Sequence, residues 1–419
     1  MQRSFFSHVL GGAALASLLW AASALAADAS YDGTTPSALQ TLTDNYGVSW
    51  ANNVLAPAGS GGTPAAPSKS PFVSEDEAPT PASSVTTLNG GTVDWVFGAV
   101  NYRDAATVSD SHQVIITGGT VSNGVYGADH WFKNGNTEAA NNCVAVSGGK
   151  VGSVVIGGQA QSDASGDASA TAKDNFVTVS GGAVTRIEGG DAWNDSSGNA
   201  SASNNTVEIR GGTVTDTVYG GYAFSDAGNA AALNNLVRIS ATPSALNLAT
   251  VWLYGGYAGS KTGATQSSGN TLQIDTTAGV KVLGLSNFQN LNFALPASLA
   301  PNVPMLTVAD TADLGTEAQI NISAPGLAVQ SGDTFTLIDA AGATLTGSVA
   351  VADDSTLNGY AYTLAITDDN KLTLTVGEQV STSADITAVP VVNPAPPTPA
   401  GLAGSACQRK EVPRWTSSI

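Results

Sequence analysis

The chain has little charge, and most of that charge is of one sign. Of its 419 residues, 11% are Asp, Glu, Lys or Arg, well below the share of about 25% that is usual in globular proteins. The 15 basic and 33 acidic residues give a formal net charge of −18. Such a surface repels phosphate backbones and anionic headgroups, which excludes nucleic-acid binding. The apolar share of 42% excludes wholesale disorder.

Cysteine and histidine are equally scarce. Cys143 and Cys407 are the only cysteines and lie far apart, so we expect no disulfide scaffold and keep a bridge between them as the minor alternative. Beyond the first 26 residues only His112 and His130 remain, too few for a zinc site or a His-based triad. The motifs H-E-x-x-H and G-x-S-x-G are absent. We therefore expect no catalytic residue, no metal and no cofactor, and a protein that is not an enzyme.

The chain begins with a predicted leader and a lead-in. Residues 1–26 carry Arg3, an apolar run and a small-x-small end, the pattern of a secretory signal peptide that is cleaved between Ala26 and Ala27. Later segments lack the roughly 20 uninterrupted apolar residues of a membrane-spanning helix. Residues 27–83 are rich in proline and glycine, which cannot maintain a strand ladder. We predict an extended linker there.

What the chain has in quantity is a repeat, which spans residues 84–275. The segments ANNCVAVSGGKVGSVVIGG (140–158), KDNFVTVSGGAVTRIEGG (173–190) and SNNTVEIRGGTVTDTVYGG (203–221) align on their glycine pairs. One slot directly before the first strand of a unit is occupied by His112, Asn142, Asn175, Asn205, Asn235 and Asn270, at spacings of 30, 33, 30, 30 and 35. Near-constant spacing of this kind is typical of solenoids.

Each unit predicts two short strands and two sharp corners. Apolar residues alternate before the first glycine pair, as at Val207 and Ile209 around Glu208, which indicates a strand with one buried face. A second short strand ends on a second glycine pair. The corner glycines, which permit positive φ, are Gly118, Gly119, Gly148, Gly149, Gly181, Gly182, Gly211, Gly212, Gly220, Gly221, Gly255 and Gly256. Because one unit cannot bury its apolar face alone, we predict an all-β fold, a right-handed parallel β-helix or solenoid of roughly 30-residue repeats.

The rest of each unit carries two further predictions. Asn at the recurrent slot tolerates a left-handed turn, and its amide can form a ladder with the copies above and below. His112 is interpreted as a substitute ladder residue. The variable Ala/Ser/Asp/Gly stretch after the second glycine pair is expected to be a loop on one face.

Acidic residues near the second corner are candidates for chemistry. They are Asp129, Asp163, Asp167, Asp174, Asp191, Asp195 and Asp226. Their spacing is irregular and Lys173 is the one basic residue nearby, so we expect solvated loop acids, with catalysis and calcium binding as minor alternatives. The repeat has G-G-x-V where the known calcium repeat needs G-G-x-G-x-D.

Aromatic residues recur just before the second glycine pair, at Phe97, Tyr126, Tyr219 and Tyr254. Our interpretation is a stack of rings that covers the corner of the solenoid. The alternative is a ridge that contacts sugars or a host surface. Its candidate ligand contacts are Trp131, Trp193, Tyr222 and Tyr257.

The repeated V-x-I-x-G-G-x-V-x-x-x-V-Y-G-G pattern resembles the passenger domains of Gram-negative autotransporters, as do the downstream segments GVKVLGLSNFQNLNFALPASLAPNVPMLTVADTADLGTEAQINIS and GDTFTLIDAAGATLTGS. The resemblance covers roughly residues 1–380 and carries no catalytic motif. It implies a β-solenoid displayed at the cell surface, with a C-terminal junction module, here 276–380, that stabilises the stalk. The outer-membrane barrel that the family implies is absent from this chain. Residues 381–419 are instead predicted to be a Pro-rich disordered tail with an atypical basic end.

From these features we expect a secreted autotransporter-type passenger, a non-enzymatic adhesin or structural surface protein that acts by multivalent contact along a repeat face. The expected partner is a host-surface glycan or protein, or a second copy of the chain. The expected localisation is the cell surface or the extracellular space if a translocator exists, and the periplasm otherwise. Two alternatives stay open: a carbohydrate-active β-helix lyase or glycosidase, and a non-functional truncated remnant.

Overall fold

The structure is a computed structural model that describes residues 29–31, 54–57, 85–103, 108–132, 135–163, 168–241, 243–275, 278–351 and 356–380. The predicted cleavage site at Ala26 and Ala27, the tail at 381–419 and most of the lead-in lie outside these residues. Two strands of the lead-in are described, β1 (Ala29–Tyr31) and β2 (Val54–Pro57), and both pair with the first repeat. Within the described ranges the chain is nearly all β, without an α-helix, and no helix there is long and apolar enough to span a bilayer.

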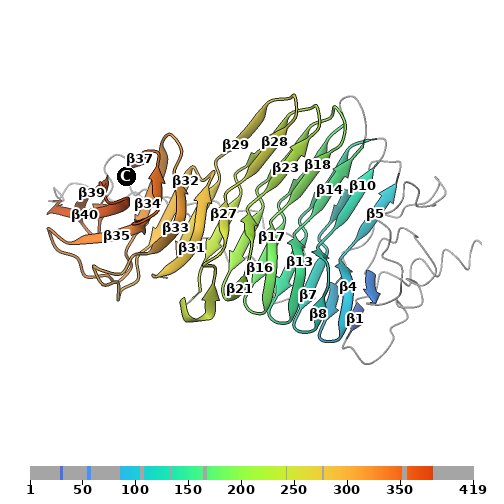
Figure 1. The fold of residues 1–419 in the computed structure, drawn as a ribbon, viewed down its shortest axis with the longest axis horizontal. Coiled ribbons are helices and arrows are strands. Elements are labelled where there is room, and N and C mark those ends of the chain that lie inside the picture. Colours follow the sequence, from blue (N-terminus) through green and yellow to red (C-terminus); the bar gives the residue numbers. More distant parts are fainter. Residues whose placement is uncertain are drawn as a thin grey trace, which may run out of the picture.

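The repeats stack as a parallel β-solenoid of about eight turns, so the predicted fold class is confirmed (Figure 1). A complete turn contributes to four sheets, which we name A, B, C and D in chain order, with one strand each except that sheet B receives two short strands in some turns. One such turn runs through β16 (Phe176–Val179), β17 (Ala183–Glu188), β18 (Asp191–Asn194) and β19 (Ala200–Ser203). The chain then reaches β20 (Thr206–Ile209), which pairs in register with β16, Val177 opposite Val207.

The other turns follow the same order. Sheet A continues through β3 (Val85–Leu88), β7 (Gln113–Ile116), β12 (Cys143–Val146), β25 (Leu236–Ile239) and β30 (Thr271–Asp275). Sheet B contains β4 (Thr92–Phe97), β8 (Thr120–Val121), β9 (Val125–Tyr126), β13 (Lys150–Ile156), β21 (Gly212–Val214), β22 (Thr217–Tyr219), β26 (Leu246–Asn247) and β27 (Trp252–Tyr254). A short 3-10 helix, η1 (Pro243–Ala245), precedes β26.

Sheets C and D are built from the stretch that follows the second glycine pair. Sheet C contains β5 (Val100–Arg103), β10 (Asp129–Phe132), β14 (Gln159–Ser162), β23 (Tyr222–Ser225) and β28 (Tyr257–Ser260). Sheet D contains β6 (Val108–Asp110), β11 (Thr137–Ala140), β15 (Ala170–Lys173), β24 (Ala230–Leu233) and β29 (Thr265–Ser268). The prediction that this stretch is a loop is therefore wrong.

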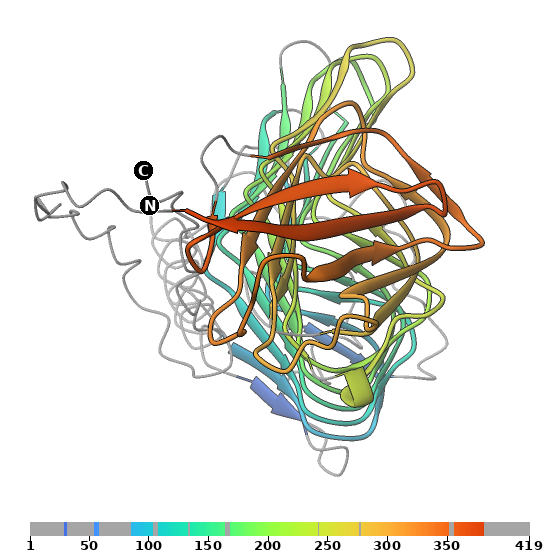
Figure 2. The same ribbon diagram turned by 90° about the vertical axis from the view of Figure 1, so that its left-hand side faces the viewer.

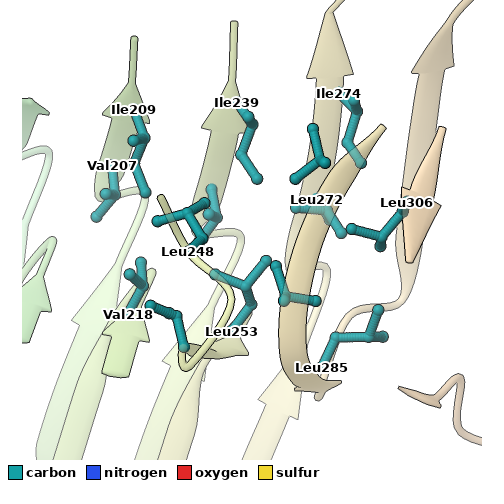
Figure 3. Packing of buried hydrophobic residues seen from close by; sticks show 14 of the residues in the cluster. Val207, Ile209, Val218, Ile239, Leu248, Leu253, Leu272, Ile274, Leu285 and Leu306 are labelled. Atoms are coloured by element: carbon teal, nitrogen blue, oxygen red, sulfur yellow. The ribbon is translucent and has the colours of Figure 1, made fainter. Parts of the chain in front are cut away.

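The four sheets enclose two separate cores. Sheets A and B bury a large Val, Ile and Leu core, part of which is drawn in Figure 3. Sheets C and D bury a second cluster made of alanine, with Ala192, Ala202 and Ala223 fully buried, beside a buried column that contains Phe132 and Asn194. We call the A–B part the body and the C–D part the fin, whose sheet C strands lie along the upper part of Figure 1. Alternating alanines do not by themselves predict a strand, because alanine has low β-propensity, yet two facing rows of methyl groups allow close sheet packing.

A ladder of buried asparagines runs along the junction of fin and body. Asn142, Asn175, Asn205, Asn235 and Asn270 are fully buried. The side-chain amide of Asn175 donates to Asn205 Oδ1 at 3.1 Å and to the Ala139 carbonyl in the fin at 3.0 Å. Asn205 and Asn235 repeat this pattern one turn on. The predicted ladder is thus confirmed, and both protons of each such amide find an acceptor.

The residue with left-handed backbone conformation, in contrast, is the one that directly precedes each ladder asparagine. Asn141, Asp174, Asn204 and Asn234 each have φ of 55°, whereas the prediction placed this conformation at the ladder asparagine itself. His112 is fully buried at the start of the ladder, and its backbone N–H donates to Asn142 Oδ1 at 3.1 Å. It occupies a ladder position, as interpreted from the sequence.

The two glycine pairs of a repeat serve different needs. In the first pair the second residue has positive φ, for example 78° at Gly182, as predicted. In the second pair the need is space: a Cβ on Gly190 would lie 2.6 Å from the Asn205 side-chain amide. Glycine at this corner therefore lets the ladder pass between the body and the fin.

After β30 the turns lose sheets C and D, and the body alone continues. Its strands are β31 (Val280–Ser286), β32 (Asn290–Ala294), β33 (Leu306–Asp313), β34 (Ala318–Ser323), β35 (Thr334–Asp339), β36 (Thr344–Thr346) and β37 (Val349–Val351). The antiparallel strands β38 (Thr356–Leu357), β39 (Tyr360–Ile366) and β40 (Lys371–Gln379) close this end (Figure 2). Pairing β35 with an antiparallel strand protects the last edge of the solenoid.

Replacing a ladder residue should destabilise the protein strongly. In Asn205→Ala the Asn175 amide and backbone N–H lose their buried acceptor, which should cost about 3 kcal/mol or more. The exposed Asn229, which accepts from the Ala264 N–H at 3.0 Å, is the control, since water can replace its oxygen. Chemical denaturation followed by circular dichroism measures both. Equal decreases in the free energy of unfolding for Asn205→Ala and Asn229→Ala would contradict the stabilising role of the ladder.

Enlarging one alanine of the fin should loosen the fin and spare the body. Ala202→Leu adds volume between sheets that are in methyl contact, whereas Ser201→Leu on the same strand points outward. Hydrogen exchange measured by mass spectrometry should show faster exchange in β18, β19, β23 and β24 for Ala202→Leu alone, with β16 and β20 unchanged. Uniform acceleration in both cores would show that the fin is not a separate unit.

Candidate functional site

The predicted aromatic residues lie on the outer surface of the corner where sheet B meets sheet C. Strand register aligns Phe97, Tyr126, Ile156, Glu188, Tyr219 and Tyr254 in one column at the end of sheet B. It aligns Asp129, Gln159, Asp191, Tyr222 and Tyr257 in the next column, at the start of sheet C. We call the surface formed by these two columns the corner surface.

Most rings on the corner surface stack on one another, and those of the four tyrosines from Tyr219 to Tyr257 are partly exposed, whereas Phe97 and Tyr126 are buried. The centroids of Tyr219 and Tyr254 are 5.0 Å apart and those of Tyr222 and Tyr257 are 4.8 Å apart, each pair nearly parallel. The ring centroids of Trp193 and Tyr222 are 6.2 Å apart. Because the flat faces of the tyrosines are occupied by each other, the outward side of the column presents ring edges and hydroxyl groups.

Three of the four candidate ligand contacts are therefore adjacent, and the fourth is apart. Trp193, Tyr222 and Tyr257 form a continuous surface. Trp131 stands in the same column of sheet C as Trp193, but Gln161 lies between them. The indole N–H of Trp131 donates to Asp163 at 2.8 Å.

Between the aromatic layers lies a charged cluster. Glu188 and Asp191 are 3% and 6% exposed. Arg186, on the same strand as Glu188, forms an ion pair with it. The Arg186 guanidinium also lies over the rings of Tyr219 and Tyr222, 5.0 and 5.5 Å from their centroids. Gln159 donates to Asp191 Oδ2 at 2.7 Å.

The cluster is not fully satisfied by hydrogen bonds. Glu188 Oε2, Asp191 Oδ1 and Arg186 Nε are buried without a hydrogen-bond partner among the described residues. A buried polar atom without a partner costs about 1–3 kcal/mol. The cluster thus lowers the stability of the fold, in contrast to the asparagine ladder.

Burial shifts the pKa of both carboxyl groups upward. It raises the pKa of Glu188 to about 8, and the charge of Asp191 adds to the shift while Arg186 opposes it. It raises the pKa of Asp191 to about 6, against the hydrogen bond from Gln159 and the charge of Arg186. The pair therefore retains a proton at a pH where exposed carboxyl groups are ionised. Burial likewise raises the pKa of Tyr219 to about 12.

The structure separates the predicted acids into different classes. Asp191 and Asp129 are buried, so the expectation of solvated loop acids is wrong for both. The others within the described residues have local partners: Asp163 accepts from Trp131, Asp195 from Gln161 and Trp193, and Asp226 pairs with Lys261, while Asp174 is a left-handed corner residue. Asp167 lies outside the described residues.

Glu188 is the residue that sequence reasoning missed. It occupies the slot before the second glycine pair in which other repeats have Phe, Tyr or Ile, as R-I-E-G-G against T-V-Y-G-G and V-V-I-G-G shows. A charged residue in an otherwise apolar or aromatic slot is the available signal. Its burial beside Asp191 depends on the corner geometry, which one strand pattern does not reveal.

No set of three or more potential metal ligands gathers anywhere in the described ranges. The two histidines are buried singly within the fold. Burial, with a further contribution from His130, lowers the pKa of His112 to about 4, and burial lowers the pKa of His130 to about 4. The expectation for cysteine is corrected: Cys143 is disulfide-bonded.

The buried carboxyl pair should make stability fall as pH rises from about 6.5 to 8. Folded Glu188 keeps its proton up to about pH 8, whereas in the unfolded chain its pKa is near 4.5. The contribution of this proton to the free energy of unfolding is therefore complete below pH 4.5 and is lost as pH rises through about 8. The lowered pKa values of His112 and His130 act only below about pH 6.5.

Thermal unfolding followed by circular dichroism at pH 6.5 and 8 tests this slope. The wild-type midpoint should be higher at pH 6.5, and Glu188→Gln, which cannot ionise, should remove the difference. Glu317→Gln changes an exposed carboxyl on the body and should keep it. A slope that survives in Glu188→Gln would refute the assignment.

Comparison with protein-family models, with curated proteins and with solved structures finds no match to this chain.

Proposed function

We propose that this protein is an exported, non-enzymatic binding solenoid whose corner surface contacts a linear glycan through several repeats at once. The observation that carries the proposal is the pair of tyrosine columns, in which Tyr219, Tyr222, Tyr254 and Tyr257 repeat at ring spacings of 5.0 and 4.8 Å. Such spacing offers the same hydroxyl and ring edge to successive units of a polymer. Weak contacts repeated along one rigid face multiply into useful avidity.

The chemistry of the corner surface suits a polar, uncharged or acidic glycan. Tyrosine hydroxyls both donate and accept hydrogen bonds, as sugar hydroxyls do. Arg186, with 36% of its side chain exposed, adds a donor fork and a positive charge in a chain with a net charge of −18. Ring edges and tyrosine hydroxyls are combined in this way in many binding surfaces.

Export and surface display form part of the same proposal. The leader pattern at 1–26 and the resemblance to autotransporter passengers support it, and the solenoid fold is compatible with it. A stalk of stacked turns suits display, because each turn contacts only its neighbours and can be added in sequence.

Removing two tyrosines should weaken binding without unfolding the protein. Tyr222→Ala with Tyr257→Ala removes both tyrosines from one column of the corner surface and should lower the affinity for a matching oligosaccharide by about tenfold. Tyr360→Ala, in the C-terminal cap, is the aromatic control. Isothermal titration calorimetry with a panel of neutral and uronic-acid oligosaccharides measures the effect. Absence of binding to the whole panel by the wild type would overturn the proposal.

A second candidate, hydrolysis or elimination on a glycan, is favoured by one observation. Glu188 and Asp191 are paired carboxyl groups with raised pKa values beside Arg186, which is how acid–base residues are tuned. Their low exposure makes binding the better assignment. Release of reducing ends or unsaturated sugars from the same panel, lost in Glu188→Gln and Asp191→Asn, would establish the enzymatic alternative.

A further inference from the structure

Two departures from the repeat meet near the N-terminal end of the fin, and both are histidines. His112, between β6 and β7, stands in the ladder position that asparagine occupies from Asn142 onward. His130 lies on β10, beside β5 at the end of sheet C (Figure 1). The later members of its column are Ala160, Ala192, Ala223 and Ala258. Both histidines are fully buried, so an ionisable group replaces a non-ionisable one at two positions of the same region.

The surroundings of the His130 ring suit its neutral form. Nδ1 lies 2.8 Å from the Glu138 carbonyl oxygen on β11, and because a carbonyl oxygen only accepts, Nδ1 carries the hydrogen and donates it. Nε2 is buried without a hydrogen-bond partner in the part of the chain that the structure describes. The Phe132 ring lies edge-on to the imidazole, with centroids 6.3 Å apart. A proton on Nε2 would therefore add a buried positive charge and an unsatisfied N–H.

The charged groups around His130 are engaged elsewhere or lie at other register positions. The ionisable residues of its own and the adjacent strands are Asp129 on β10, Arg103 on β5, Asp110 on β6 and Glu138 on β11, whereas β7 and β14 have none. Asp129 belongs to the corner surface, and the Glu138 carboxylate pairs with Lys173 at 2.9 Å on the outer side of sheet D. Arg103 and Asp110 stand opposite Phe132 and Ala140 in register. His112 is the other titratable group nearby, and a charge on His130 disfavours a charge on His112.

Acid therefore acts against this end of the fin. Burial lowers the pKa of both histidines to about 4, from about 6.5 in the unfolded chain, and for His130 the hydrogen bond to the Glu138 carbonyl opposes the shift. The stability that the neutral rings contribute is complete above about pH 6.5 and is lost as pH falls toward 4. Glu188 and Asp191 have raised pKa values, so their contribution is retained in acid. The loss at low pH is thus specific to the histidine end.

We propose that His112 and His130 are an acid-sensitive pair: while neutral they hold β10 and β11 closed on the body, and their protonation opens this end of the fin. The opening is local because the fin has its own alanine cluster and because few strands lie beyond β10 and β11. It leaves the edges of β14 and β15 unpaired, and such edges are open to pairing with another chain. The inference does not rest on the proposed glycan binding, because it concerns other residues.

Hydrogen exchange of the full chain, measured by mass spectrometry at pH 7 and pH 5, tests the opening. Each rate is divided by the intrinsic exchange rate at the same pH, so that protection factors are compared. Protection of β10 and β11 should fall by about a hundredfold at pH 5, roughly tenfold for each histidine, while that of β24 stays within about twofold. Unchanged protection of β10 and β11, or an equal loss in β24, would overturn the proposal.

Variants that restore the repeat separate the histidines from other acid effects. His112→Asn with His130→Ala introduces the residues of the later turns, and it should keep the protection of β10 and β11 at pH 5. Glu138→Gln, which leaves the carbonyl in place, is the matched control and should lose protection as the wild type does. Circular dichroism at pH 7 checks the β content. If the double variant fails this check, His112→Asn alone should reduce the loss to about tenfold. A loss of wild-type size in either histidine variant would show that other groups cause the opening.

Discussion

The buried asparagine ladder is the interaction on which the rest of the structure depends. An uncharged amide has two donors and an oxygen with two acceptor sites, so in a stack of identical turns each residue can satisfy its neighbour. Asn205 does this with Asn235 on one side and Asn175 on the other, and its second proton reaches the Ala172 carbonyl of the fin. The ladder therefore fixes both the register of successive turns and the position of the fin on the body.

The ladder also explains why one chain makes two cores. A polar row at the junction separates the Val, Ile and Leu core of the body from the alanine core of the fin. The junction must be narrow, and glycines such as Gly190 supply the space opposite Asn205. Alanine then suffices beyond it, because two sheets held together at their base can pack methyl group on methyl group. At the C-terminal end, where Gln289 Oε1 accepts from the last ladder residue, Asn270, sheets C and D end as well.

The sequence predicts the features that recur in every repeat, but it does not predict contacts that depend on how separate segments pack in space. The body strands, the first glycine corner and the ladder follow from periodicity, because the same physical need recurs at each turn. The strands of the fin do not follow from periodicity, because a segment of alternating alanines also resembles a loop. At the corner surface Trp193, Tyr222 and Tyr257 were found as repeated aromatics, whereas Glu188 is a single departure from the repeat.

Departures from the repeat carry the functional information in a solenoid of this kind. A turn that served only to extend the stack would keep an uncharged side chain at position 188, as the turns at Ile156 and Tyr219 do. Instead it buries Glu188 beside Asp191, with oxygen atoms left unpaired among the described residues, although such burial lowers stability. Local rules are broken in this way chiefly where another requirement outweighs stability. The corner surface thus differs from the rest of the stack because it buries charged groups at a cost in folding free energy. Arg186, which lies over the Tyr219 and Tyr222 rings, connects these charged groups to the tyrosine columns.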